Sequence, residues 1–271
     1  MSRRAVSTPP LPLRSFANLV DPGRIVMGRF RDRPASYPRL CWLPWSVACL
    51  LLAAALAVWV DPLAGLMYGR WPAALAGPAR SITDLGLGVW YIVPSVACLV
   101  AMNLVDWRAL SNRSLMLACN WTGFAAYVLA STGLSGLAVN LLKYGIGRAR
   151  PLHFAELGAF SLHPFAFDAG FAGMPSGHAT TMGAVFAVVL LCFPRWRHAA
   201  LACALAICAT RVLVGAHYPA DVVAGFGFGF GCAALLAVLF ARLGFVFRQR
   251  GAGLPVARTT FRLLPRKAKR K

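Results

Sequence analysis

His178 and His217 each interrupt an apolar stretch of the sequence. The residue types around them are those that nucleophilic and acid–base catalysis requires. One imidazole can attack an electrophile while a second protonates the departing group. Asp221 follows His217 by four residues across Pro219, at the expected first turn of a helix, so its carboxylate is expected to hold one imidazole N–H. His178 has no carboxylate close to it in the sequence. The pattern predicts His217 as a nucleophile supported by Asp221, and His178 as a general acid.

Basic residues near these histidines indicate what the chemistry would act on. Lys143, Arg150 and Arg211 are cations that could surround a phosphoryl group and neutralise the charge on its oxygens in the transition state. Ser176 and Gly177 stand where an apolar helix is expected to begin, so a hydroxyl and free backbone N–H groups could donate to the same oxygens. The sequence therefore predicts a binding site for a phosphate group.

These residues would have to be positioned by helices in a membrane. With 271 residues, of which 59% are hydrophobic and 13% charged, the chain has the composition of a polytopic membrane protein. Long apolar runs without alternation favour helices, because backbone polar groups in hydrocarbon must be paired internally. The candidate spans are 41–60, 85–105, 114–142, 176–194, 198–216 and 222–241. We therefore predict an all-α, six-span transmembrane bundle.

The distribution of basic residues predicts the orientation of this bundle. Of 28 Lys and Arg residues, 18 lie in segments 1–40 and 242–271, and every second connection between the spans is basic. The positive-inside rule then places both termini in the cytoplasm and the polar clusters together at the outer face. No stacking-aromatic or zinc pattern accompanies the formal charge of +20, which argues against nucleic-acid binding. We expect a basic leader at 1–40, one membrane domain at 41–241 and a basic tail at 242–271.

The polar clusters form a three-part motif. Lys143, Arg150 and Pro151 match Lys-x6-Arg-Pro, Pro175 to His178 spell Pro-Ser-Gly-His, and Arg211, His217 and Asp221 match Arg-x5-His-x3-Asp, with Thr210 where serine is usual. In these motifs the chain closely resembles the type 2 phosphatidic acid phosphatase superfamily, which also contains vanadium haloperoxidases and glucose-6-phosphatases. The resemblance implies a reaction that needs no metal or other cofactor. It implies phosphate binding by Lys143, Arg150, Ser176, Gly177 and Arg211, with His178 as the acid and His217, supported by Asp221, as the nucleophile.

The resemblance makes an integral membrane lipid phosphatase with a phosphohistidine intermediate the leading hypothesis. The motifs are expected to contact only the phosphoryl group, so they do not distinguish among four candidate substrates. These are phosphatidate, phosphatidylglycerol phosphate, a polyprenyl diphosphate and a lipid A phosphate. The competing hypotheses are vanadate-dependent halide oxidation, which six spans disfavour, and a non-catalytic lipid or anion transporter, which the pairing of His217 with Asp221 disfavours. In a Gram-negative bacterium the location would be the inner membrane, with a periplasmic active site. The oligomeric state is not predicted.

Some features admit a structural interpretation beside a functional one. Segment 152–174, with five phenylalanines, could form a lid over a lipid headgroup or settle at the membrane interface. Residues 81–84 could cap a helix or edge the active site. Arg148 is expected to be a bystander, although it could touch a second phosphate or a sugar. The glycines of 225–231 lie at the spacing of closely packed helices, and the eight cysteines lack the spacing of a metal site.

Overall fold

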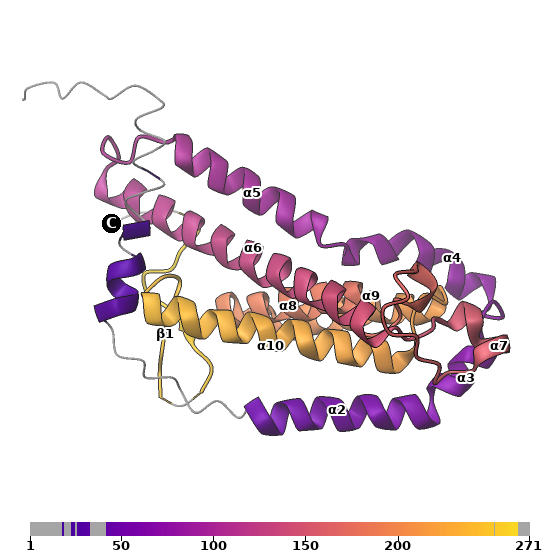
Figure 1. Cartoon of the computed structure of the whole chain (residues 1–271). Helices are drawn as coiled ribbons and strands as arrows, with labels where there is room; N and C mark the ends of the chain where they lie inside the picture. Colours follow the sequence, from indigo (N-terminus) through magenta and orange to yellow (C-terminus); the bar gives the residue numbers. More distant parts are fainter. Residues whose placement is uncertain (1–17, 19–22, 25, 33–41, 252, 265–271) are drawn as a thin grey trace, which may run out of the picture.

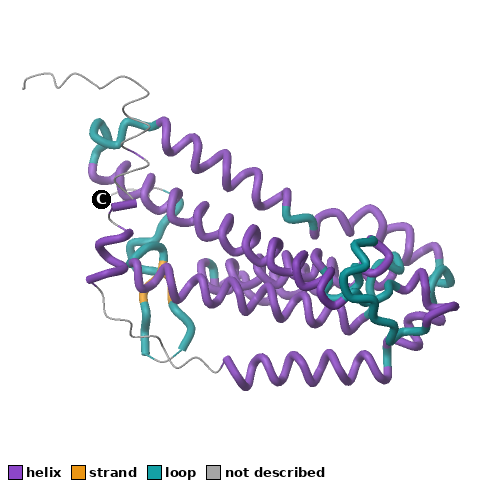
Figure 2. Tube along the Cα trace, viewed as in Figure 1, coloured by secondary structure: helices purple, strands orange, loops and turns teal. Residues whose placement is uncertain are grey.

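The computed structural model describes residues 18, 23–24, 26–32, 42–251 and 253–264, so most of the predicted leader 1–40 lies outside the described residues. The chain forms a helical bundle, seen in Figure 1 and as a tube in Figure 2. Its main helices are α2 (Trp42–Trp59), α5 (Val89–Leu104), α6 (Asn112–Ile146), α8 (Gly177–Cys192), α9 (Arg197–Leu213) and α10 (Pro219–Leu243). The predicted all-α membrane fold is confirmed.

Short elements occupy the two ends of the bundle. One end carries α3 (Asp61–Leu66), α4 (Ala73–Ile82), η1 (Thr83–Gly86), η2 (Pro151–His153), α7 (Phe154–Leu157) and η3 (Ala169–Phe171). The other end carries η4 (Pro194–Trp196) and an antiparallel hairpin of β1 (Phe247–Arg248) and β2 (Val256–Ala257). The first end also holds the predicted site residues, which lie at helix ends or in the adjoining loops.

The predicted count of six spans is not confirmed, because five helical segments within the described part of the chain are long and apolar enough to cross a membrane. They are Trp42–Trp59, Ala73–Leu104, Asn112–Ile146, Pro194–Leu213 and Pro219–Leu243. The remaining candidate, 176–194, forms α8, whose 16 residues fall short of the ~20 that usually cross the hydrocarbon. Ten of these residues are buried, since α8 packs against α6, α9 and α10. Its surroundings are therefore mainly protein along most of its length.

The segment between the first two predicted spans is helical and belongs to the bundle. Asp61 begins α3 directly after α2 and is completely buried. After α4, the short helix η1 lies against α8 and α9 before the chain enters α5. This path brings residues 83–86 to the same end as the predicted site.

Gly225 and Gly229 allow α10 to lie directly against α8. A β-carbon on Gly229 would overlap the backbone carbonyl of Thr180, and one on Gly225 would overlap that of Ser176. Small residues at this spacing let helix backbones approach closely. The prediction of close helix packing is confirmed for Gly225 and Gly229, and their contact fixes the N-terminal ends of α8 and α10 next to each other.

The C-terminal segment closes the opposite end of the bundle. Phe247 of β1 is fully buried and its ring meets that of Tyr127 edge to face, with centroids 4.8 Å apart. Asn120 of α6 donates hydrogen bonds to the carbonyls of Thr260 (2.9 Å) and Arg262 (3.0 Å). Part of the predicted basic tail is thus folded against the helices.

We predict that Gly229→Ala destabilises the protein by about 1–3 kcal/mol, because the added methyl group forces α10 away from α8. The matched control is Gly231→Ala on the same helix, where the nearest atom to a new β-carbon is Trp45 Nε1 at 3.9 Å. Both changes gain the same helix propensity. Thermal unfolding of the purified variants in detergent measures the difference, and equal melting temperatures would contradict the packing role.

Candidate active site

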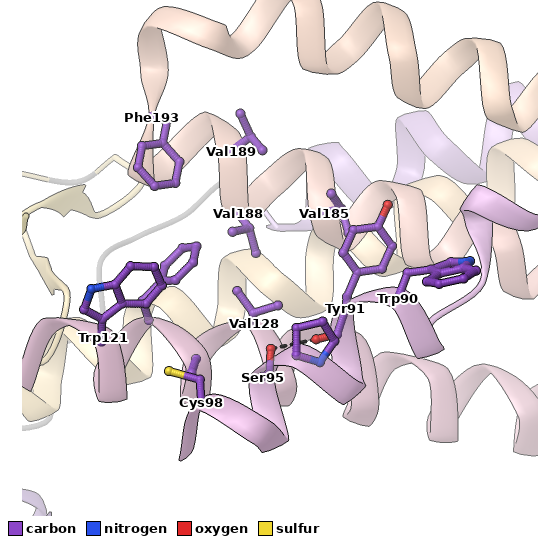
Figure 3. Close-up of a pocket in the computed structure, with 13 residues that line it drawn as sticks. Trp90, Tyr91, Ser95, Cys98, Trp121, Val128, Val185, Val188, Val189 and Phe193 are labelled. Atoms are coloured by element: carbon purple, nitrogen blue, oxygen red, sulfur yellow. Dashed lines mark hydrogen bonds between the residues drawn. The ribbon is translucent and has the colours of Figure 1, made fainter. Parts of the chain in front are cut away.

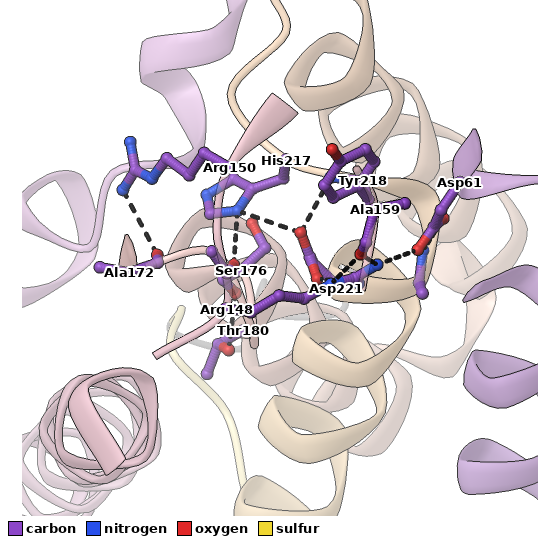
Figure 4. A network of polar contacts seen from close by, with 12 residues as sticks. Asp61, Arg148, Arg150, Ala159, Ala172, Ser176, Thr180, His217, Tyr218 and Asp221 are labelled. Carbon is purple, nitrogen blue, oxygen red and sulfur yellow. Dashed lines mark hydrogen bonds and ion pairs between the residues drawn. The ribbon is translucent and has the colours of Figure 1, made fainter. Parts of the chain in front are cut away.

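Helix ends bring the three motifs together at one end of the bundle (Figure 4). α6 ends just after Lys143, where Gly147 takes a left-handed conformation (φ 63°) and donates its N–H to the Lys143 carbonyl. α8 begins directly after Ser176, whose backbone N–H donates to the carbonyl of Asp221 at 2.9 Å. α10 begins two residues after His217. The predicted residues therefore share one site although they are far apart in sequence.

His217 is 2% exposed and has one ring nitrogen fixed by the backbone. Its Nδ1 lies 2.7 Å from the carbonyl oxygen of Gly173. A carbonyl only accepts hydrogen bonds, so Nδ1 carries the proton and the lone pair stands on Nε2. This tautomer leaves Nε2 available as a nucleophile.

Asp221 is close to His217 but does not make the direct hydrogen bond that the sequence suggests. Its Oδ2 lies 3.9 Å from Nδ1 of His217, beyond hydrogen-bond distance. The two carboxylate oxygens have other donors: the N–H of Tyr218 at 2.9 Å and Nη1 of Arg148 at 2.6 Å. Asp221 can therefore act on His217 through its charge, whereas the Gly173 carbonyl orients the ring.

The electrostatics of His217 show that the three predicted cations converge on it. Burial lowers the pKa of His217 well below its usual value. Positive charges act in the same direction, in decreasing order Arg150, Lys143 and Arg211. The imidazole is therefore unprotonated at neutral pH, which is the state that a nucleophile requires.

Several buried polar atoms around His217 have no hydrogen-bond partner within the described chain. They are Nε of Arg150, Oγ of Ser176, Nε2 of His178 and Nε of Arg211. A buried polar group without a partner costs about 1–3 kcal/mol, so a cluster of such groups indicates a ligand. Each of the four can donate a hydrogen bond, and a phosphoryl group offers oxygens that accept them. The arrangement fits an anion with several oxygens.

Within segment 81–84, Thr83 and Asp84 begin η1 and lie at the edge of this site, which is the functional one of the two roles predicted for the segment. Nη1 of Arg211 donates to Oγ1 of Thr83 at 2.6 Å. Gly86 lies so close to His178 that a β-carbon there would stand 2.9 Å from the imidazole ring. The helix η1 therefore orients one cation and borders the ring predicted to be the acid.

Arg148 is not the bystander that the sequence suggests. It is 3% exposed and forms ion pairs with Asp221 and with Asp61, the latter at 2.7 Å. Burial acts to lower the pKa of Arg148, but the two carboxylates outweigh it and the pKa rises. The contact with Asp61 joins residues 87 positions apart. The only sequence signal for it is a carboxylate directly after an apolar run.

An apolar cavity of about 310 Å³ lies between α5, α6 and α8 (Figure 3). One of its ends adjoins η1, because Trp90 donates to the carbonyl of Asp84 at 2.8 Å and Tyr91 to that of Leu85 at 3.3 Å. The other end is lined by Trp121 and Phe193. The cavity therefore extends along the bundle from the short helix that borders the candidate site.

Comparisons with known proteins agree with the motifs and their geometry. Residues 124–245 match the model of the PAP2 superfamily. The chain is 42% identical over 193 residues to a lipid A 1-phosphatase of Rhizobium etli, covering 70% of this chain and 82% of the relative. A lipid A 1-phosphatase of Rhizobium johnstonii is 42% identical over 194 residues, covering 70% and 78%. No solved structure matches the chain. The chain belongs to the PAP2 superfamily.

Family, relatives and apolar helices together confirm the prediction of a membrane lipid phosphatase. The roles of single residues, the phosphohistidine intermediate, independence of metals and the orientation in the membrane stay predictions. Among the described residues, no group of three or more His, Cys, Asp or Glu side chains could hold a metal ion.

Proposed function

We propose that this chain hydrolyses the 1-phosphate of lipid A through a phosphohistidine intermediate on His217. The observation that supports the chemistry is the free Nε2 of a buried imidazole among cations and donors without partners. The choice of substrate is supported by 42% identity to two proteins named lipid A 1-phosphatase over 70% of the chain. The proposal needs no metal in either chemical step.

In the first step, Nε2 of His217 attacks phosphorus, an N–P bond forms, and the bond between phosphorus and the sugar oxygen breaks. His178 donates a proton to that oxygen, which leaves as a hydroxyl. Lys143, Arg150 and Arg211 neutralise the charge on the other phosphoryl oxygens. Burial, followed by the charges of Arg211 and Lys143, lowers the pKa of His178 to about 4. A bound phosphate offsets the repulsion from these cations, so phosphate binding favours the protonated acid form.

In the second step, water attacks phosphorus while His178 accepts one of its protons. The N–P bond breaks, inorganic phosphate leaves and His217 is restored. The negative charge of Asp221 stabilises the positive charge that the His217 ring gains in the first step and carries until the N–P bond breaks in the second, although Asp221 does not bond to the ring directly.

The apolar cavity supports a lipid as the substrate. A phosphate on a lipid would place apolar chains beside the charged site, and the cavity that adjoins η1 offers an acyl chain a place to lie. Its wall is almost entirely hydrophobic or aromatic, from Trp90 to Phe193. A soluble phosphate ester would leave this space unused.

We predict that detergent-purified protein releases phosphate from lipid A in excess chelator, and that His217→Ala abolishes release. The panel also contains phosphatidate, phosphatidylglycerol phosphate and a polyprenyl diphosphate, and mass spectrometry shows which phosphate of lipid A is lost. Preference for another lipid would refute the substrate assignment. Loss of activity in chelator that is restored by a divalent metal ion would refute the metal-free mechanism, and turnover by His217→Ala would refute the nucleophile.

His178→Ala should reduce hydrolysis of a lipid ester by about 100-fold or more, and that of an activated ester such as nitrophenyl phosphate much less. A good leaving group departs without a proton, so it does not need the acid. The comparison of kcat on the two substrates measures this. Equal loss on both would contradict the role of His178 as general acid.

The orientation that we propose has both termini in the cytoplasm of a Gram-negative bacterium and the site at the periplasmic face of the inner membrane. It is supported by the basic segments before α2 and after α10 and by the positive-inside rule. The α7 end and the β1 end lie at opposite ends of the bundle, so they would face different compartments.

Labelling of introduced cysteines tests this orientation. Glu156 on α7 and Arg248 on β1 are both exposed. Glu156→Cys should react with an impermeant maleimide in cells whose outer membrane alone is permeabilised, and Arg248→Cys only after lysis. The unsubstituted chain shows the background of the native cysteines, and the reverse pattern would overturn the orientation.

A further inference from the structure

Three charged side chains form a buried network beside the candidate site (Figure 4). Arg148 donates to Asp221 Oδ1 at 2.6 Å and to Asp61 Oδ2 at 2.7 Å. It is 3% exposed, and both aspartates are completely buried. Two further hydrogen bonds connect its guanidinium to the carbonyl of Ala159, at 2.8 Å and 3.2 Å. The network joins the start of α3 to the loop after α6 and to the start of α10.

Stability alone is a poor reason for burying three charges. Removing ions from water is expensive, and buried ion pairs can often be replaced by apolar residues without loss of stability. Asp61 comes from α3, outside the residues 124–245 that match the family model. It therefore adds a negative charge from a part of the chain that the family match does not include.

The network fixes the backbone on which His217 stands. Oδ1 of Asp61 accepts the N–H of Ala220 at 3.0 Å, and Oδ2 of Asp221 accepts that of Tyr218 at 2.9 Å. These are backbone donors at the start of α10, where helix N–H groups have no partner inside the helix. With both bound, the chain directly after His217 has little freedom to move.

The network also determines the net charge beside the His217 ring. Arg148 and Asp221 alone would cancel each other. With Asp61 ionised the group carries one net negative charge, and its nearest oxygen lies 3.9 Å from Nδ1 of His217. When Nε2 forms a bond to phosphorus, the ring becomes positive, and a fixed negative charge nearby stabilises that change.

We infer that Asp61 is a positioning residue for phosphoryl transfer, which acts through Arg148 to hold Asp221 and His217 in place and to keep the network negative. The inference rests on the proposed phosphohistidine chemistry. It assigns Asp61 no contact with substrate. Its effect is expected in the rate of the chemical step rather than in substrate binding.

The test compares Asp61→Asn with wild type and with Glu156→Gln, which removes one negative charge from an exposed side chain on α7, a helix in contact with α3. Asparagine keeps the shape and an acceptor for Ala220 but loses the charge. We expect kcat to fall about tenfold or more, with KM changed less than about twofold. Asp61→Glu restores the charge and should recover part of kcat, and Glu156→Gln should behave as wild type.

A second readout does not depend on the lipid. A phosphohistidine formed from inorganic phosphate exchanges the phosphate oxygens with water, and labelled phosphate reports this exchange. Asp61→Asn should slow the exchange by the same factor as kcat. If wild type exchanges oxygen but hydrolyses no lipid of the panel, the substrate assignment fails while the effect of Asp61 is still measured. If wild type does neither, both proposals fail.

A wild-type kcat in Asp61→Asn, with only a lower melting temperature, would overturn the inference and leave Asp61 as a helix cap. If Asp61→Asn does not fold, the variant Arg148→Lys provides the test of the inference. Lysine keeps the positive charge but cannot donate to both carboxylates with a planar fork. The inference then requires a reduced kcat at unchanged KM, and a wild-type kcat would refute it.

Discussion

Repulsion between like charges in a poorly hydrated site is the constraint on which the rest of this structure depends. Arg150, Lys143 and Arg211 all act on His217, and no carboxylate of the described chain pairs with them directly. Such charges are held together only if each is attached to a rigid element. Lys143 lies on the last turn of α6, and Arg150 directly precedes η2. Arg211 donates a hydrogen bond to Thr83 of η1. The phosphate of the proposed substrate would supply the negative charge that pairs with these cations.

Arg148, in contrast to these three cations, is paired with carboxylates of the protein. It is more deeply buried than these cations, and it is neutralised twice within the protein. All three nitrogens of the Arg148 guanidinium already donate within the protein, whereas Arg150 and Arg211 each keep a buried nitrogen without a partner among the described residues. The same residue type therefore has a structural role at one position, and two residues later it is a predicted phosphate ligand. The difference comes from the carboxylates that each side chain meets.

Spacing of residues in the sequence predicts the parts of the site that lie on helix ends. Lys143, His178 and Arg211 could be expected at one end, because a loop joins the first two and two apolar runs separate the last two. The partner of His217 could not be predicted, because it is the carbonyl of Gly173 and any residue has a carbonyl. The role of Asp61 could not be predicted for another reason. Its contacts are with residues 87 and 159 positions away in the sequence, and no local sequence pattern indicates such contacts. The short length of α8 was also hidden, since a buried helix and a membrane span have similar composition.

The loop between α6 and α8 connects the charged site with the apolar surroundings. It is anchored by backbone bonds, such as the N–H of His163 to the carbonyl of Gly147 at 2.7 Å, so it is not a loose flap. Within this loop, however, Phe160, Phe165 and Phe167 are 59%, 67% and 74% exposed, respectively. Large exposed aromatic side chains are unfavourable in water but suit the interface of a bilayer. A fixed polar backbone with apolar side chains turned outward can border a phosphate on one side and lipid on the other. The loop can therefore cover a lipid headgroup with one face and anchor the protein at the membrane interface with the other.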